Sequence, residues 1–222
     1  MRAMEADAQA YAASACEELH RLGDKGPKEE FFKYYPEISR GFSQALDKNN
    51  GKMGHDLLTA TFKAWYDQST TKSVYENGYL LEPMQRELDY IAKGYKIAKT
   101  FEKSISARQT IAEIAWTKNG NYFQDDPDIL NSGKYLDVSE FTMEQMKKFF
   151  EFRKEMTGVD DSKALDGIPT RQNSRLSGLR EIKKPVETQK TASIKRNKEA
   201  VKNQNLAKSF IYAQKIAAKH SR

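Results

Sequence analysis

Residues 84–118 read MQRELDYIAKGYKIAKTFEKSISARQTIAEIAWTK, and this stretch decides the fold class. Apolar side chains recur along it with a near-heptad rhythm, which is the spacing of one face of an α-helix. Glu102 and Gln109 interrupt the rhythm, and Asn119-Gly120 supplies a stop signal after it. The pattern predicts one long central helix, whose apolar face carries Leu88, Ile91, Tyr95, Ala98, Ile105, Ala112 and Trp116.

Shorter helices are predicted on both sides of this stretch. Gly23 and Gly158 end two of them, Pro27 opens a third, and the glycine turn at 49–51 separates two more. The expected helical ranges are 3–22, 28–35, 38–48, 54–67 and 139–157.

The apolar residues of three of these helices fall on one side. We expect the first helix to bury Met4, Ala8, Tyr11, Ala15 and Leu22. The helix at 54–67 is expected to bury Leu57, Leu58, Phe62 and Trp65, and the helix at 139–157 to bury Phe141, Met146, Phe149, Phe150 and Met156.

Only residues 73–81, SVYENGYLL, have the pattern of β-structure. Their Asn77-Gly78 pair is typical of a tight hairpin turn, although an isolated hairpin is marginally stable. The rest of the pattern is helical. The sequence therefore predicts an all-α protein, an irregular helical bundle with a long central helix.

The composition changes near residue 160. From there to residue 198 the chain has few large apolar side chains and many Gly, Ser, Thr, Pro and charged residues, which is typical of a flexible linker. Residues 199–219 regain a helical pattern, with an apolar arc opposite four lysines. We expect a helical body over 1–160, a basic flexible linker or tail over 161–198 and an amphipathic helix over 199–222.

Charge divides the chain in the same place. The 222 residues hold 37 Lys and Arg and 31 Asp and Glu. Residues 170–222 hold 14 of those basic residues and 3 of the acidic ones, so this C-terminal segment carries +11 and residues 1–169 carry −5. Such asymmetry indicates that the C-terminal segment binds a polyanion or an acidic protein surface.

The basic residues of residues 183–198, KKPVETQKTASIKRNK, form two clusters with ten residues between them. This spacing resembles a bipartite nuclear localisation signal, whose two clusters occupy separate acidic grooves of an import receptor. A chance match in a lysine-rich tail remains the alternative, and so does binding to phosphates. The residues predicted to bind a polyanion or receptor are Arg180, Lys183, Lys184, Lys195, Arg196 and Lys198.

The terminal helix predicts a second contact. Leu206, Phe210 and Ile211 lie on its apolar arc and are the residues expected to dock in a partner's groove. Folding back onto the acidic body is an alternative. The many alanines of the terminal helix would allow only shallow insertion into a membrane, so any membrane contact is expected to be peripheral.

No pattern of catalytic, cofactor-binding or metal-binding residues is found. The sequence lacks GxGxxG, GxxxxGK[ST], HExxH and GxSxG, and its three histidines are too scattered for a zinc site. Cys16 is the only cysteine, which suits a reducing compartment. No apolar run approaches the roughly 18 residues of a membrane span. We therefore expect no cofactor, and a soluble intracellular protein of the cytoplasm, or of the nucleus in a eukaryotic cell.

Taken together, these features favour binding over catalysis. The first hypothesis is a non-catalytic helical interaction protein, such as an adaptor, assembly factor or effector, which binds a protein partner through its surface and basic tail. The alternative is a nucleic-acid-binding accessory protein that uses the tail for non-specific phosphate contacts. A helical enzyme with a dispersed active site is the third hypothesis. The sequence does not predict the oligomeric state.

Overall fold

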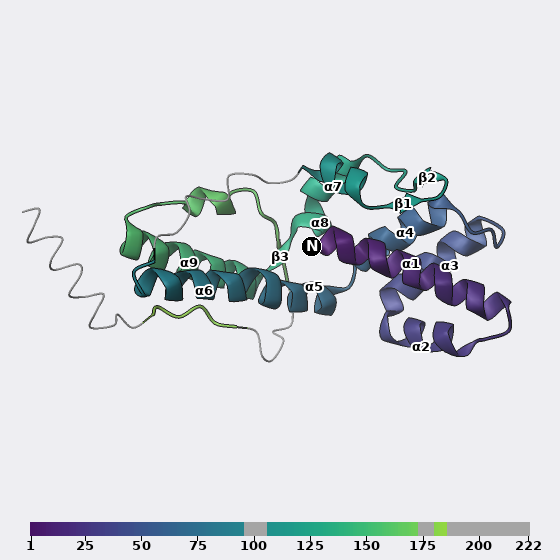
Figure 1. Ribbon diagram of the computed structural model, residues 1–222, viewed down its shortest axis with the longest axis horizontal. Coiled ribbons are helices and arrows are strands. Elements are labelled where there is room, and N and C mark those ends of the chain that lie inside the picture. Colours follow the sequence, from purple (N-terminus) through teal and green to yellow (C-terminus); the bar gives the residue numbers. More distant parts are fainter. Residues whose placement is uncertain (96–105, 173–179, 186–222) are drawn as a thin grey trace, which may run out of the picture.

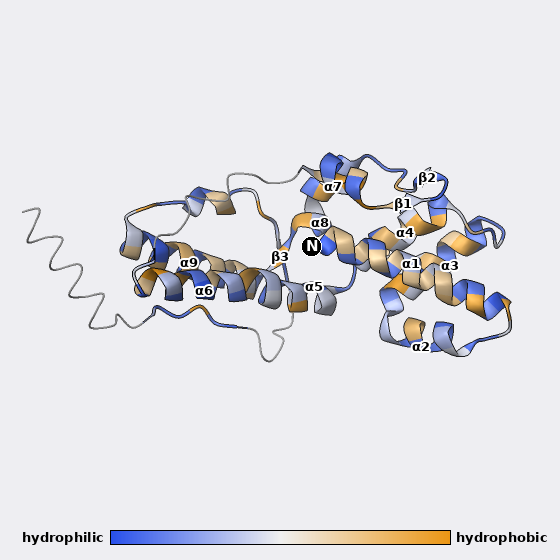
Figure 2. Cartoon of the chain, in the orientation of Figure 1, coloured by the Kyte–Doolittle hydropathy of each residue, from blue (hydrophilic) through white to orange (hydrophobic). Residues whose placement is uncertain are grey.

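The structure is a computed structural model that describes residues 1–95, 106–172 and 180–185. Helices dominate these residues, so the predicted all-α class is confirmed for them. The elements gather in two groups along the long axis of the molecule (Figure 1). Each group encloses its own cluster of buried apolar side chains. Most helices carry both polar and apolar residues along their length (Figure 2).

The larger group, the large lobe, is built around α1, which packs against α2 and α4. The helix α3 packs on α4 from the other side. Its core includes Phe42, Phe62, Trp65 and Tyr122. The elements of the large lobe are α1 (Arg2–Arg21), α2 (Gly26–Tyr34), α3 (Pro36–Lys48), α4 (His55–Trp65), α7 (Ala107–Glu113), and the antiparallel pair β1 (Trp116–Thr117) and β2 (Gly120–Asn121).

The second group, the small lobe, is formed mainly by α6 and α9, which lie side by side (Figure 1). Leu88, Met146, Phe149 and Phe150 pack in its core. The elements of the small lobe are the π-helical turn η1 (Asn77–Leu81), α6 (Glu82–Ala92), β3 (Val138–Ser139), α9 (Glu140–Thr157), the 3₁₀ turn η3 (Ser162–Leu165) and β4 (Thr170–Arg171).

The two lobes are joined by two segments of chain. The helix α5 (Ser69–Glu76) follows the large lobe and continues directly into η1. The 3₁₀ turn η2 (Pro127–Asn131) and α8 (Gly133–Leu136) lead back to the small lobe at β3. The strand β3 then pairs in parallel with β4, with Val138 opposite Thr170 and Ser139 opposite Arg171.

The predicted long central helix is wrong. The helix α6 ends at Ala92, and Gly94 turns the chain with a φ of +81°, a conformation that favours glycine. A new helix, α7, begins after Ser106, whose side chain forms a capping box with Gln109. The helical spacing of apolar residues is found on both sides of this break because α6 and α7 each bury one face. The two faces are buried in different lobes.

The predicted hairpin at 73–81 is also wrong, because these residues continue the helix of α5 through η1 into α6. The wide turn of η1 ends two residues before Pro83, which lacks a backbone N–H and crowds the preceding turn of a helix. A π-helical turn accommodates both effects. Asn77 and Gly78 lie in that turn rather than in a β-turn.

The helix α1 exists as predicted but buries another face. Met4 and Leu22 are 56% and 84% exposed, whereas Ala3, Ala6, Ala10 and Ala13 are buried. Alanine carries a single methyl group, so this face allows neighbouring helices to approach closely. The predicted apolar stripe therefore lies on the surface of the large lobe.

The helix predicted at 139–157 is confirmed, and so is its buried face. The Ser139 side chain caps its first turn, and Gly158 ends it with a φ of +78°. Beyond it, the described residues of the predicted linker are packed on the body: Thr170–Arg171 pair with β3, and Ile182 lies in the core of the small lobe. The remainder of that linker and the predicted terminal helix lie outside the described residues.

Candidate functional site

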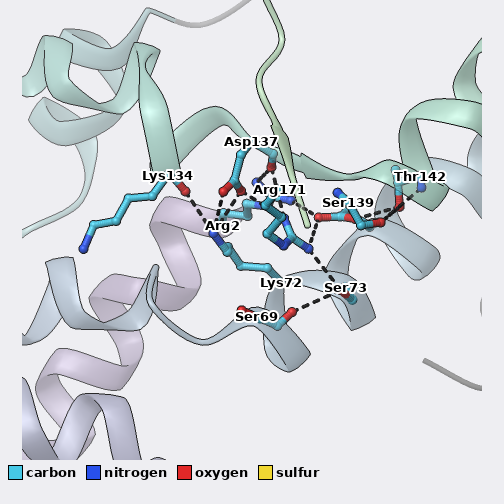
Figure 3. Close-up of polar contacts among 10 residues, drawn as sticks. Arg2, Ser69, Lys72, Ser73, Lys134, Asp137, Ser139, Thr142 and Arg171 are labelled. Atoms are coloured by element: carbon cyan, nitrogen blue, oxygen red, sulfur yellow. Dashed lines mark hydrogen bonds and ion pairs between the residues drawn. The ribbon is translucent and has the colours of Figure 1, made fainter. Parts of the chain in front are cut away.

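A network of charged side chains lies where the two lobes meet (Figure 3). Its carboxylates are Glu76, at the end of α5, and Asp137, directly before β3. Its cations come from three elements that are distant in sequence: Arg2 from α1, Lys72 from α5 and Arg171 from β4. All five residues are at least half-buried, so the network replaces hydration by mutual contacts.

Glu76 is held from four directions. Its Oε1 atom lies 2.6 Å from an Arg2 nitrogen and 2.6 Å from an Arg171 nitrogen. Its Oε2 atom accepts hydrogen bonds from the Thr142 hydroxyl at 2.6 Å and the Ser139 backbone N–H at 3.1 Å. The side chain is only 1% exposed, so these contacts take the place of water.

Asp137 is bound in a similar way. Its Oδ1 atom lies 2.9 Å from both Lys72 Nζ and Arg171 Nη1, and its Oδ2 atom lies 3.1 Å from Lys72 Nζ. Arg2 also donates to its backbone carbonyl at 2.7 Å. Arg2, Glu76, Asp137 and Arg171 thus connect the first helix, α5, β3 and β4.

Burial disfavours the charged forms of the cations in this network. It lowers the pKa of Lys72, although the hydrogen bonds to Asp137 and the charge of Asp137 oppose the change. Burial also lowers the pKa of Arg2, which the charge of Glu76 opposes. Every carboxylate oxygen already accepts a hydrogen bond or ion pair, so neither carboxylate is available as a general base. The network connects residues of the two lobes.

The predicted binding residues lie elsewhere. Arg180, Lys183 and Lys184 are exposed, in an extended segment that runs along the small lobe. Lys184 forms an ion pair with Glu155 of α9. The other predicted binding residues, Lys195, Arg196, Lys198, Leu206, Phe210 and Ile211, lie outside the described residues.

Three side-chain amides hold the backbone of this segment. Asn77 Oδ1 accepts the N–H of Arg180 at 2.7 Å, and Gln145 Oε1 accepts the N–H of Ile182 at 2.9 Å. Gln85 makes two contacts with Lys183: its Oε1 accepts the N–H at 2.7 Å, and its Nε2 donates to the carbonyl at 3.1 Å. Ile182 is 4% exposed and packs with the apolar residues of the small lobe. We call these three amides and the apolar pocket of Ile182 the amide groove.

Sequence reasoning missed the amide groove and the charge network. Some residues of the amide groove and of the charge network do have a recognisable feature in the sequence. Lys72, Glu76 and Gln145 lie on the faces of their helices that are turned to the protein core. Polar residues at such positions are buried only when they have hydrogen-bond or ion-pair partners. Ile182 is the one large aliphatic residue between Arg180 and Pro185. Which partners they find depends on the tertiary fold.

A hollow of about 400 Å³ lies on the large lobe. His55 lies in it, with Nε2 3.1 Å from the Thr117 hydroxyl, and Glu18 lies on the rim. Within the described ranges, no group of three or more His, Cys, Asp or Glu residues is arranged to hold a metal ion. The hollow therefore offers a surface for contact and a single imidazole.

Comparison with protein-family models, with curated proteins and with solved structures found no match for this chain. Among the residues that the structure describes, every helix is too short or too polar to cross a lipid bilayer. The function is therefore argued from the geometry and charge of the chain.

Proposed function

We propose that this chain is a helical interaction protein that binds a protein partner through its surface and its basic C-terminal region. The observation that carries the proposal is the attachment of residues 180–185. The amide groove holds their backbone, while the side chains of Lys183 and Lys184 stay exposed. Residues 180–185 are thus fixed on the small lobe with both lysine side chains exposed, Lys184 beside Glu155.

The surface of the large lobe supports a second contact with the same partner. Met4 is exposed on α1 and Leu22 directly after it, and the Tyr11 hydroxyl donates to the carbonyl of Trp116, whose side chain is also exposed. Tyr11 also borders the hollow that contains His55. An exposed aromatic side chain beside a hollow is typical of protein-binding surfaces.

A second candidate function is non-specific binding to nucleic acid. The +11 charge of residues 170–222 favours it, because each phosphate that a lysine or arginine neutralises releases a counterion. We place it second because phosphate binding needs only the charge of the tail, whereas the ordered attachment at the amide groove suits a defined partner.

The test compares two variants of the full chain that lose the same charge. The first replaces Lys195, Arg196 and Lys198 by Gln, and the control replaces Lys25, Lys33 and Lys52, which are exposed on the large lobe. Fluorescence anisotropy measures the binding of labelled single- and double-stranded oligonucleotides between 50 and 200 mM salt. A pull-down with the full chain as bait measures capture of a protein partner, and Phe210→Ser with Ile211→Ser tests the docking of the terminal residues.

The proposal expects a partner whose capture falls with the tail variant and with Phe210→Ser/Ile211→Ser, is unchanged by the control, and depends less steeply on salt than oligonucleotide binding does. The nucleic-acid alternative expects oligonucleotide affinity to fall by orders of magnitude over this salt range, with the log–log slope reduced by about 3 for three lost phosphate contacts. Steep salt dependence that survives the apolar substitutions would replace the first proposal by the second.

A further inference from the structure

The side of α1 that faces away from the large lobe carries an apolar stripe with heptad spacing. The helix buries a row of four alanines, Ala3, Ala6, Ala10 and Ala13. On the other side, exposed residues follow one another at alternating intervals of four and three: Met4, Ala8, Tyr11, Ala15, Glu18 and Leu22. Leu22 directly follows the last helical residue and keeps helical backbone angles. At about 100° per residue these six positions lie within an arc of about 80°, so they form a continuous stripe.

This α1 stripe has the form of a coiled-coil contact surface. Residues at alternating intervals of four and three form the seam between two supercoiled helices, and Glu18 is the one charged residue of the stripe. A surface helix of a single domain usually has polar residues on this side. Leu19 and Trp116, both exposed, lie beside the stripe, and the Trp116 carbonyl accepts the Tyr11 hydroxyl. The stripe lies on the near side of the large lobe, along α1 (Figure 1), and fits a second helix.

The α1 stripe complements itself when two copies of α1 run antiparallel. In an antiparallel pair, each first position of the heptad meets a fourth position of the other helix. This rule sets Tyr11 against Ala15 of the second copy, so that a large side chain lies over a small one. It also sets Met4 against Leu22, which join two apolar side chains at each end of the seam. The alanines of the stripe allow the two helices to approach closely.

Glu18 disfavours the parallel arrangement. Two parallel copies would set Glu18 against Glu18 and Tyr11 against Tyr11, which combines repulsion of like charges with overpacking. The antiparallel pair instead sets Glu18 against Ala8 of the second copy, whose single methyl group leaves the carboxylate open to solvent. One charged residue in an otherwise apolar seam therefore selects the orientation of the two helices.

We propose that the chain forms a two-fold symmetric dimer in which α1 pairs antiparallel with α1 of a second copy. The same residues of both copies form the interface, as two-fold symmetry requires. One pair of helices buries less than the roughly 800 Å² per partner of a standard interface, so the dimer is weak and depends on concentration. The dimer covers Tyr11 and thus competes with the second contact of the proposed function, but it forms without any partner.

Sedimentation equilibrium of the full chain, between about 1 μM and about 1 mM, measures the dissociation constant of the dimer. Ala8 is the most informative position, because it is exposed and meets Glu18 of the second copy only in the antiparallel pair. We expect Ala8→Lys to lower the dissociation constant by about three- to tenfold, since symmetry creates two pairs of opposite charge. Ala8→Glu should raise it by a similar factor. In a Glu18→Gln background, Ala8→Lys should give no gain.

The control adds the same charge far from α1. Ala164→Lys changes an exposed residue of η3 in the small lobe and should leave the dissociation constant unchanged. The chain already carries a net charge of +6, so a further lysine increases the general repulsion between copies. Tighter association of Ala8→Lys therefore requires a specific contact. Circular dichroism of each variant checks that the fold is retained.

The proposal is overturned if the chain is monomeric over the whole concentration range, which would leave the α1 stripe to a helix of another protein. It is also overturned by a dimer that Ala8→Lys weakens, as in a parallel pair. A dimer that neither Ala8→Lys nor Ala8→Glu changes would have its interface elsewhere and would contradict the proposal too. These measurements use no partner, so their failure leaves the proposed function intact, and loss of partner capture would leave the dimer intact.

Discussion

Glu76 is the residue on which the two lobes depend most directly. Its carboxylate joins Arg2 of the large lobe to Arg171 of the small lobe and is almost fully buried. The net contribution of a buried ion pair to stability is small, because desolvation offsets the attraction. Loss of one partner is costly, because the other charges remain buried without compensation.

We therefore predict that Glu76→Gln lowers the free energy of unfolding by about 3–5 kcal/mol. Urea unfolding followed by circular dichroism measures the change. The matched control is Glu82→Gln, which removes an exposed pair with Arg86 at 3.9 Å and should cost less than about 1 kcal/mol. Equal effects of the two substitutions would show that the network does not hold the fold.

Glu17 allows a prediction of how the stability of the chain changes at acid pH. Burial acts to raise its pKa, but hydrogen bonds from Lys28 at 2.6 Å and Arg21 at 2.8 Å, with their charges, hold the pKa below the ordinary glutamate value. A lowered folded-state pKa contributes stability that is present above the ordinary pKa and is lost as the pH falls through the lowered one.

We expect Glu17→Gln to destabilise the chain at pH 7 and to have progressively less effect below the ordinary glutamate pKa of about 4.3. Urea unfolding of both proteins at several pH values measures this difference. A difference that stays constant between pH 7 and the acid range would mean that Glu17 contributes through packing alone.

At the residue scale, the sequence predicted apolar burial better than polar contacts. Leu57, Phe62 and Trp65 are buried as expected, because helical spacing alone places them on one face. The contacts of Arg2 and Gln145 join residues that are distant in the chain, and no local pattern encodes such partners. The identity of the groove residues therefore required the structure.

At the scale of elements, the packing of α3 on α4 depends on a glycine. A Cβ atom at Gly41 would lie 2.5 Å from the Ala64 Cβ, closer than two carbons can approach. Gly78, in the π-helical turn, has open space around its Cα and a backbone that any residue adopts. Gly41 is therefore needed for the close approach of α3 and α4, whereas no steric requirement calls for glycine at position 78.

Gly41→Ala is predicted to lower the melting temperature. Overpacking costs about 1–3 kcal/mol, and the gain in helix propensity of about 1 kcal/mol offsets only part of it. Gly78→Ala should leave the melting temperature unchanged or raise it slightly, because it makes no clash. Thermal unfolding of the two variants compares them directly; a stabilised Gly41→Ala protein would contradict the close packing.

Local signals explain which elements were predictable. Ser139 and Gly158 bound α9 at the expected residues, because caps act within one turn. The prediction of one long helix over 84–118 failed because Gly94 and Ser106 are helix-end signals inside a stretch whose apolar spacing continues on both sides of them. The hairpin prediction failed because tertiary packing keeps residues 73–81 helical from α5 through η1, where Asn77 and Gly78 lie.

At the scale of the whole molecule, the charge network should make the two lobes unfold together. Both tryptophans, Trp65 and Trp116, lie in the large lobe, so their fluorescence reports on that lobe alone. Circular dichroism reports on helices in both lobes. Coincident midpoints of the two signals indicate a single cooperative transition.

We predict coincident midpoints for the wild-type chain and separate ones for Arg171→Gln. The substitution removes the ion pairs of β4 with Glu76 and Asp137, and the small lobe, which has the smaller apolar core, should unfold first. Circular dichroism would then change before fluorescence. Arg86→Gln, at an exposed arginine of the same lobe, is the control and should keep the midpoints together.

The all-α class and the basic character of the C-terminal segment were predictable from composition and spacing, which act over the whole chain. The division into two lobes was not, because a single apolar rhythm spans α6 and α7 while their cores are separate. The attachment of residues 180–185 was missed because one isoleucine among charged residues gives no periodic signal.

The span of the charge network also orders events during synthesis. A ribosome adds Arg2 before Arg171, which follows it by 169 residues. At about 5–20 residues per second, Arg2 and Glu76 wait roughly 5–20 seconds or more for their last partner. The large lobe can assemble in that interval, but the junction closes only when Arg171 has been made. A chain truncated before Arg171 would carry an unfinished junction, and the quality-control machinery of a cell would meet it as an incompletely folded protein.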